Sequence, residues 1–361
     1  MTRLTAASYP AAAIGFFSRL EGSSFMRGEL RKDPATGKWV LVRPRAASNG
    51  ESDQGACPFC PGNEHLTPPE ISAYRPQAGD SGRTGWEVRV IPERDPYFVI
   101  EEEMVREGIG MFDRISTRGA SEIVVESPDH GMTLQSADEA QIERVLWMYR
   151  DRVKDLKRDL KIRNVVVTRR HGKPGSRIRH PYSRVLAAPI VFDDLRTELT
   201  QAREYYAYKR RCVFCDTIRE EMANGDRVIQ LTSHFVAFVP YAARVPFELR
   251  ILPRRHASTF ESVTPEEVGD LARLFKSLCG LLVKGLGDPS YGITLHTAPN
   301  LAVKIVQGEW DTIERDYHWH FEIMVEPERA TGVSGIAVTD MLPEEAARVL
   351  REAGSLEGPR G

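Results

Sequence analysis

The sequence lacks long apolar runs, a large net charge of either sign and an abundance of cysteine. No segment has about 18 or more consecutive apolar residues, so we expect no membrane-spanning helix. The 49 Lys and Arg residues nearly balance the 51 Asp and Glu residues, which removes any global electrostatic argument for nucleic-acid binding. Five cysteines in 361 residues fit metal binding in a reducing compartment better than a disulfide framework. We therefore expect a cytoplasmic protein.

Four of the five cysteines belong to a metal-site pattern that occurs twice. In each copy a Cys-x-x-Cys pair is followed by two separate histidines, and two thiolates with two imidazoles form a closed tetrahedral zinc site. The first copy contains Cys57, Cys60, His130 and His180, and the second contains Cys212, Cys215, His256 and the pair His318 and His320, of which one side chain is able to bind metal while the other faces a ligand. We therefore expect two zinc ions per chain. The remaining Cys279 stands in an apolar helical pattern, which predicts an inert core thiol.

The two copies also share an order of predicted elements. Apolar residues with periods of two and 3.6 predict strands, then a long helix, then further strands in each half. The first half has strands at 86–91, 122–126, 164–168 and 185–191 with a helix at 138–160, and the second has strands at 235–241, 247–252, 293–297 and 319–325 with a helix at 264–284. A linker over 193–208 and a C-terminal helix from Pro343 complete the pattern. This duplication predicts an α+β fold, an antiparallel sheet covered by helices, with halves at 26–195 and 196–361.

Residues 1–25 differ from the rest, with a short stretch of small apolar residues after Arg3. We expect a disordered N-terminal extension, or sequence that precedes a native start at Met26. A secretion signal fits less well, because Pro10 interrupts the apolar stretch and no clean cleavage site follows it.

Several motifs resemble one known family, in matching order from about residue 29 to about residue 351. They are Cys57-Pro-Phe-Cys60, Glu122 to His130, Cys212-Val-Phe-Cys215 and Ile251 to His256. In these motifs the chain resembles the galactose-1-phosphate uridylyltransferases of the histidine-triad superfamily. The resemblance implies an internally duplicated histidine-triad-like fold, a homodimer and a phosphorylated small-molecule ligand. It also implies two zinc sites, one held by Cys57, Cys60, His130 and His180 and the other by Cys212, Cys215, His256 and His318.

The first half departs from that family at its reactive site. The family's nucleophile is the second His of a His-Pro-His motif, and that position is Tyr182 here. Three positions that resemble the family's phosphate contacts are Arg184, Arg177 and Arg169, the last shifting to Arg170 if one residue is deleted between. We therefore expect a rebuilt pocket in which arginine binds an anion; the bland alternative is a solvated basic loop.

The chemistry of Tyr182 argues against the family's ordinary reaction. Phenol has a pKa of about 10 and is mostly protonated at neutral pH. A nucleophilic tyrosine is chemically possible, which makes Tyr182 a candidate catalytic residue, although a phosphotyrosine diester is more stable than a phosphohistidine. We therefore expect weak or absent uridylyl transfer.

The second half offers another candidate pair, His320 and Glu322 in His318-Trp319-His320-Phe321-Glu322. Side chains at i and i+2 of a strand share a face, so Glu322 is placed to orient His320 as a nucleophile or base. The alternative is that His320 only packs or supports the metal site.

Two functions from different classes follow. One is a zinc-containing nucleotidyltransferase-like enzyme that acts on a nucleotide, nucleotide sugar or sugar phosphate with altered chemistry. The alternative is a non-catalytic anion-binding protein that keeps zinc for folding. Nucleic acid is a less suitable partner, because no series of stacking aromatic residues accompanies the arginines.

Overall fold

The computed structural model describes residues 28–43, 56–76, 85–172, 179–303, 310–326, 332–333 and 335–355. The predicted extension over 1–25 and the predicted anion-binding Arg177 lie outside these residues. Among the helices of the described segments, none is long and apolar enough to cross a bilayer.

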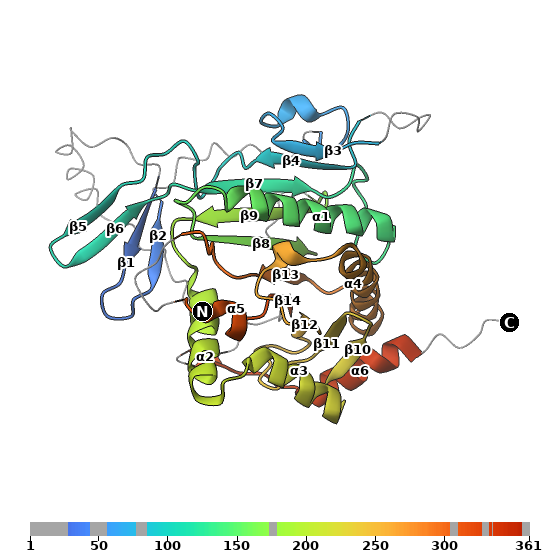
Figure 1. Cartoon of the computed structure of the whole chain (residues 1–361). Helices are drawn as coiled ribbons and strands as arrows, with labels where there is room; N and C mark the ends of the chain where they lie inside the picture. Colours follow the sequence, from blue (N-terminus) through green and yellow to red (C-terminus); the bar gives the residue numbers. More distant parts are fainter. Residues whose placement is uncertain are drawn as a thin grey trace, which may run out of the picture.

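A ten-stranded sheet forms the centre of the molecule (Figure 1). Every neighbouring pair in it is antiparallel. Its strands, in spatial order, are β10 (Val228–Leu231), β11 (Phe235–Phe238), β12 (Leu249–Pro253), β14 (His320–Val325), β13 (Tyr291–His296), β8 (Asn164–His171), β9 (Tyr182–Ala188), β7 (Ala120–Val125), β4 (Val88–Pro92) and β3 (Ser72–Tyr74). The predicted α+β class with an antiparallel sheet is confirmed.

Each half contributes five strands in the same spatial order. Reading from either edge inward, the first three strands follow chain order, and the last two are exchanged. A long helix separates the third and fourth strands in both halves. The halves meet where β8 pairs with β13, with Thr168 opposite Thr294. The division at residue 195 stays a prediction, and it falls inside a helix.

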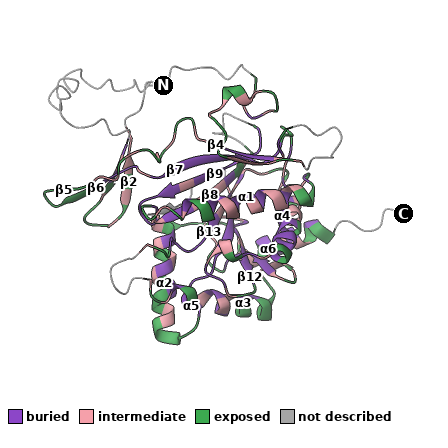
Figure 2. Ribbon diagram, turned by 45° about the horizontal axis from the view of Figure 1, so that its top comes forward, coloured by how far each residue is buried: buried purple, intermediate pink, exposed green. Residues whose placement is uncertain are grey.

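Two long helices, α1 (Glu139–Leu156) and α4 (Pro265–Leu286), contact each other and cover one face of the sheet. Buried residues at helical spacing on both helices, such as Val145 and Leu271, join a core cluster that includes strands of both halves. Figure 2 shows the buried strands and the exposed outer surfaces of the helices. The short C-terminal helix α6 (Pro343–Ser355) packs on α4 and β10.

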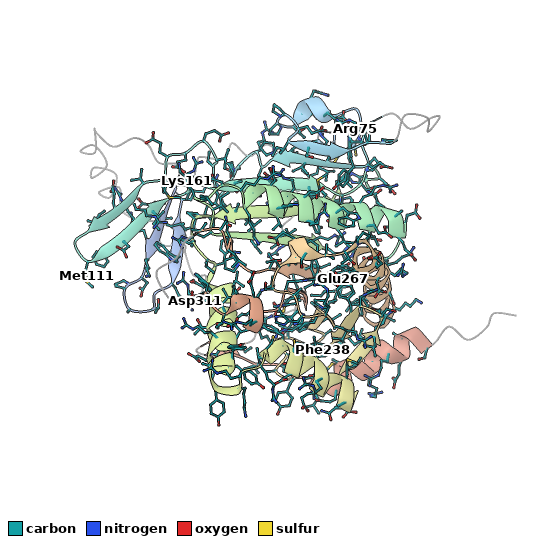
Figure 3. The ribbon with its side chains drawn as sticks, in the orientation of Figure 1. Arg75, Met111, Lys161, Phe238, Glu267 and Asp311 are labelled. Atoms are coloured by element: carbon teal, nitrogen blue, oxygen red, sulfur yellow. The ribbon has the colours of Figure 1, made fainter. Side chains whose placement is uncertain are left out.

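The opposite face of the sheet, which we call the site face, is covered unequally. Over the second half, α2 (Asp193–Lys209) and α3 (Val213–Asn224) pack on Val236, Phe238 and Leu252, and α5 (Ile313–Asp316) contacts α2. Figure 3 labels Phe238 among these strands. The linker predicted over 193–208 is wrong, because this segment is the helix α2, whose buried Leu195, Leu199 and Ala202 recur along one side.

Beside the first half stands a second, small sheet. Its spatial order is β2 (Trp39–Val42), β1 (Glu29–Lys32), β6 (Phe112–Ser116) and β5 (Arg106–Ile109). Leu30 and Ile115 pack with Phe98 and Ile190, so this sheet is attached to the end of β9. The β5–β6 hairpin projects from the body, with Met111 at its tip (Figure 3). Single turns at Glu64–Leu66 and Phe260–Ser262 and a hairpin of β15 (Gly332–Val333) and β16 (Ile336–Ala337) complete the described elements.

Candidate active site and metal centres

The four predicted ligands of the first half converge at the start of β9. Cys57 and Cys60 lie in the turn before residues 64–66, His130 follows β7, and His180 precedes β9. The Cys60 Sγ is 3.4 Å from the His130 Nδ1 and 3.7 Å from the His180 Nδ1. One donor atom from each residue lies within 4.8 Å of all the others. Two thiols and two imidazoles at this spacing match the donors of a closed zinc site.

The second set converges in the same way around the start of α3. Cys212 is the residue before α3, Cys215 is in its first turn, His256 follows β12 and His318 precedes β14. The Cys215 Sγ is 3.3 Å from the His256 Nδ1 and 3.9 Å from the His318 Nδ1. Hydrogen bonding from the Cys212 thiol, followed by that from the two histidines, lowers the pKa of Cys215 to about 3. A thiolate is the form that binds zinc.

Backbone carbonyls orient three of these histidines. The Nε2 of His180 is 2.7 Å from the Ser127 carbonyl oxygen, that of His256 is 3.0 Å from Glu314, and that of His318 is 2.8 Å from Arg255. An Nε2–H that donates to a carbonyl leaves the Nδ1 lone pair directed at the thiols. The donor sets of both halves therefore suit a metal ion.

Tyr182 lies on the site face, directly beside the first set of ligands. Its ring meets the Phe59 ring edge-on at 5.6 Å between centroids. Arg184, two residues along β9, lies on the same face and is about two-fifths exposed. Its Nη2 is 2.9 Å from the Glu93 Oε1, while the Glu93 Oε2 is buried without a hydrogen-bond partner among the described residues. A partly exposed tyrosine and arginine thus stand together.

Arg169 does not lie on the site face with Tyr182 and Arg184. Arg169 is opposite Ser183 in the sheet, so its side chain lies on the face covered by α1. There its Nε donates to the Glu126 Oε2 at 2.9 Å, with side-chain exposures of 6% and 0%. The next residue, Arg170, lies on the site face, and both Arg170 and Tyr182 are one residue beyond the last β8–β9 pair, Arg169 with Ser183. The alternative position weighed from the sequence, Arg170, is therefore the one beside Tyr182.

His320 and Glu322 also lie on the site face, but both are buried. The His320 ring is stacked on His296 at 4.7 Å between centroids and is tilted against Phe214 at 5.5 Å. Phe214, within the second Cys-x-x-Cys pair, thus contacts His320 as Phe59 in the first pair contacts Tyr182. Glu322 contacts Arg244, Arg250 and His296 instead of orienting His320. With exposures of 0% and 5%, neither residue is open to a substrate in this arrangement.

Sequence reasoning missed two members of this buried cluster, Glu198 and His296. The Glu198 Oε1 is 3.2 Å from the His296 Nδ1 and 3.5 Å from the His320 Nε2. Although burial opposes its charged form, Glu198 and Glu322 raise the pKa of His296 to about 10. One donor atom from each of Glu198, His296, His320 and Glu322 lies within 4.8 Å of the others, so this set also suits a metal ion. The signal for His296 was its place on a predicted strand; Glu198 had none, because its helix was taken for a linker.

The chain is similar to known proteins over most of its length. The family model "Galactose-1-phosphate uridyl transferase, C-terminal domain" matches residues 198–355. "ADP-glucose phosphorylase" of Arabidopsis thaliana is 28% identical over 341 residues, which cover 90% of this chain and 92% of that protein. "Galactose-1-phosphate uridylyltransferase" of Thermotoga maritima is 28% identical over 344 residues, which cover 90% and 98%.

Solved structures give the same result for the fold. A structure of a uridylyltransferase superposes with a TM-score of 0.75 at 29% identity and covers 92% of this chain and 100% of that one. The Arabidopsis thaliana ADP-glucose phosphorylase with bound ADP-glucose gives a TM-score of 0.69 at 28% identity, with coverages of 90% and 99%. These relatives are enzymes of nucleotidyltransferase type, and one of them holds a phosphorylated small molecule.

Proposed function

The chain is a member of the galactose-1-phosphate uridylyltransferase-like family and an enzyme of nucleotidyltransferase type on sugar phosphates, and from this premise we propose that it cleaves a nucleotide sugar at the site face of its first half. The proposed reaction does not pass through a histidine adduct. The observation that carries the proposal is the group of Tyr182, Arg184 and Arg170 on a partly exposed face, beside a closed set of metal ligands.

The second half lacks such an accessible group among its described residues. Its counterpart of Tyr182 is His320, which α2 and Phe214 cover completely. A substrate has access to the first half without a rearrangement of the helices, so the two halves have different tasks in this proposal. His320 and Glu322 then act in the buried cluster and not on the substrate.

Direct displacement fits a site whose nucleophile position is a phenol. An oxygen of an acceptor phosphate attacks the α-phosphorus of the nucleotide sugar, and the bond from that phosphorus to the oxygen of the sugar phosphate breaks. The leaving oxygen keeps the electron pair. Guanidinium groups and a tyrosine hydroxyl stabilise the charge that spreads over the phosphate oxygens. Tyr182, Arg184 and Arg170 take these roles.

Both arginines have carboxylate partners that the ligand has to displace. Arg170 pairs with Glu326 at 3.0 Å on a largely exposed side chain, which makes this pair weak. Arg184 pairs with Glu93, whose pKa is raised by burial. A ligand with two or more negative charges competes better for both arginines than a neutral sugar does.

Zinc has a supporting role in this proposal. The residues that would hold it are Cys57, Cys60, His130 and His180 in the first half and Cys212, Cys215, His256 and His318 in the second. Four protein ligands would leave no open position for a substrate, so a bound metal would supply rigidity to the segments that carry Phe59 and Tyr182.

The test is an assay with α-labelled ADP-glucose and UDP-glucose, each with inorganic phosphate or a sugar phosphate as acceptor. We expect a labelled nucleotide product and a loss of about tenfold or more in kcat/KM for Arg184→Ala, because charge-assisted hydrogen bonds contribute about 1.5–3 kcal/mol. UDP-glucose with galactose 1-phosphate should turn over weakly, and Tyr182→His alone should not restore that reaction. Rapid turnover of this pair, or no effect of Arg184→Ala, would contradict the proposal.

A further inference from the structure

A row of polar side chains crosses the site face from the first half to the second. Register places Arg184 beside Thr168, Thr168 beside Thr294, and Thr294 beside Glu322. Since adjacent strands are about 4.8 Å apart, this row spans about 14 Å. It therefore joins the arginine beside Tyr182 to the edge of the buried carboxylate cluster.

The middle of this row is partly exposed and chemically unused within the described structure. Thr168 and Thr294 are both half-buried, while the alternate residues Val167 and Ile293 face the core under α1 and α4. Neither threonine hydroxyl has a hydrogen bond to another described residue. A hydroxyl offers one donor and two acceptor positions, so this pair is able to serve groups that both donate and accept.

Gly292 leaves space beside the two threonines. It lies on the site face two residues before Thr294, and a Cβ built on it meets no atom closer than the Arg169 carbonyl oxygen at 3.9 Å. Its φ is not in the left-handed region, so the backbone does not require glycine. The missing side chain thus keeps a shallow space open where both halves meet.

We propose that this strip, defined by Thr168, Thr294 and Gly292, binds the sugar of the substrate while its phosphate lies against Arg184 and Arg170. The inference rests on the proposed function and adds to it where the sugar lies. Sugar hydroxyls both donate and accept hydrogen bonds, which the two threonine hydroxyls match, and the strip begins at the arginine that binds the phosphate.

The experiment is calorimetric titration of ADP-glucose, glucose 1-phosphate and inorganic phosphate into the wild type and four variants. Thr294→Val removes one hydroxyl and keeps the shape of the side chain. Gly292→Leu fills the space above the strip, and Gly108→Leu is its matched control, a strand glycine on the exposed hairpin with no atom within 4 Å of its Cβ position. Arg184→Ala reports on the phosphate position. Thermal unfolding checks that each variant is folded.

We expect Thr294→Val to raise the Kd of ADP-glucose and glucose 1-phosphate by about tenfold, the usual effect of a lost hydrogen bond, and Gly292→Leu to raise it further. Phosphate binding should be unchanged in Thr294→Val, and Gly108→Leu should resemble the wild type. Wild-type affinity of Thr294→Val and Gly292→Leu for glucose 1-phosphate would overturn the inference, as would no measurable binding of either sugar ligand to the wild type. If Thr294→Val and Gly292→Leu bind normally but Arg184→Ala weakens the binding of all ligands, only the sugar position is wrong. If Arg184→Ala weakens the binding of none, the proposed function fails too.

Discussion

Arg169 and Arg170 are neighbours in the chain, yet their side chains lie on opposite faces of the sheet. Arg169 is buried against Glu126, which also accepts hydrogen bonds from Tyr149 and Ser183. Arg170 is largely exposed on the site face. The motif alone left the choice between them open, because only the register with β9 shows which arginine stands beside Tyr182.

This difference gives opposite predictions for the two arginines. Arg169→Met should lower the free energy of unfolding by about 3–5 kcal/mol, because it leaves the buried Glu126 carboxylate unpaired. Arg170→Met should change stability by less than about 0.5 kcal/mol and weaken ADP-glucose binding instead. Urea unfolding and calorimetry of both variants check this. A destabilised Arg170→Met with normal affinity would reverse the assignment.

Glu93 should couple ligand binding to pH. Burial raises the pKa of its carboxyl, while Arg184 and then Arg43 oppose the rise. When a ligand phosphate engages Arg184, part of this opposition is lost, so the pKa of Glu93 rises further and the carboxyl takes up a proton. Affinity for ADP-glucose should then increase as the pH falls.

The measurement is calorimetry in two buffers with different ionisation enthalpies. The wild type should take up protons on binding, and Glu93→Gln should take up fewer and bind more tightly, because Arg184 is free of a competitor. Equal proton uptake by both proteins would show that another group titrates.

At the scale of elements, the start of α4 is determined by a capping box in the sequence. Thr264 accepts from the Glu267 N–H, and the Glu267 carboxylate accepts from the Thr264 N–H at 2.9 Å. Arg255 adds an ion pair at 2.9 Å. Burial opposes the charge of Glu267, but Arg255 and the Thr264 N–H outweigh it and lower the pKa of Glu267. Figure 3 places Glu267 at the beginning of α4.

The lowered pKa sets the pH range in which this capping box stabilises the fold. The contribution is present above the ordinary value of 4.5 and is lost as the pH falls through the lower pKa of the folded state. Glu267→Gln should therefore cost about 1 kcal/mol or more at pH 7, and the gap to the wild type should narrow below pH 4.5. Urea unfolding at both pH values measures it; a gap that widens in acid would contradict the assignment.

The long helices α1 and α4 could be predicted from the sequence. The apolar residues of α1 and α4 recur at helical spacing, such as Val145 and Leu271, and each helix follows an N-terminal signal. The helix α2 was missed, because its apolar residues are few and its exposed end is rich in tyrosine and charge. The buried cluster was missed because α2 was missed, since the cluster forms only when α2 brings Glu198 to His296 and His320.

Across the whole molecule, both predicted zinc ligand sets converge, because the residue types that bind zinc are few and their spacing recurs. We expect two zinc ions per chain, and removal of either should destabilise the protein. Elemental analysis of the purified protein and of Cys60→Ser and Cys215→Ser should give two, one and one. A protein without zinc would contradict this prediction. Three ions per chain would indicate that the buried cluster of Glu198, His296, His320 and Glu322 also binds a metal ion.

A duplicated sheet with one half open and the other closed is the central feature of the molecule. The site face carries Tyr182 and Arg184 in reach of a ligand, whereas α2 and α3 cover the corresponding part of the second half. In the proposed function, catalysis belongs to the first half, in which Tyr182 stands at the position of the family's histidine. The buried half keeps its histidines within a network of carboxylates.

The most direct measurement is a crystal structure with ADP-glucose or UDP-glucose bound at saturating concentration. The account predicts that phosphate oxygens lie within hydrogen-bonding distance of Arg170 and Arg184, near the Tyr182 hydroxyl, with no covalent bond to the protein. Ligand density in the second half, a nucleotide joined to Tyr182 or His320, or an empty site face would contradict it.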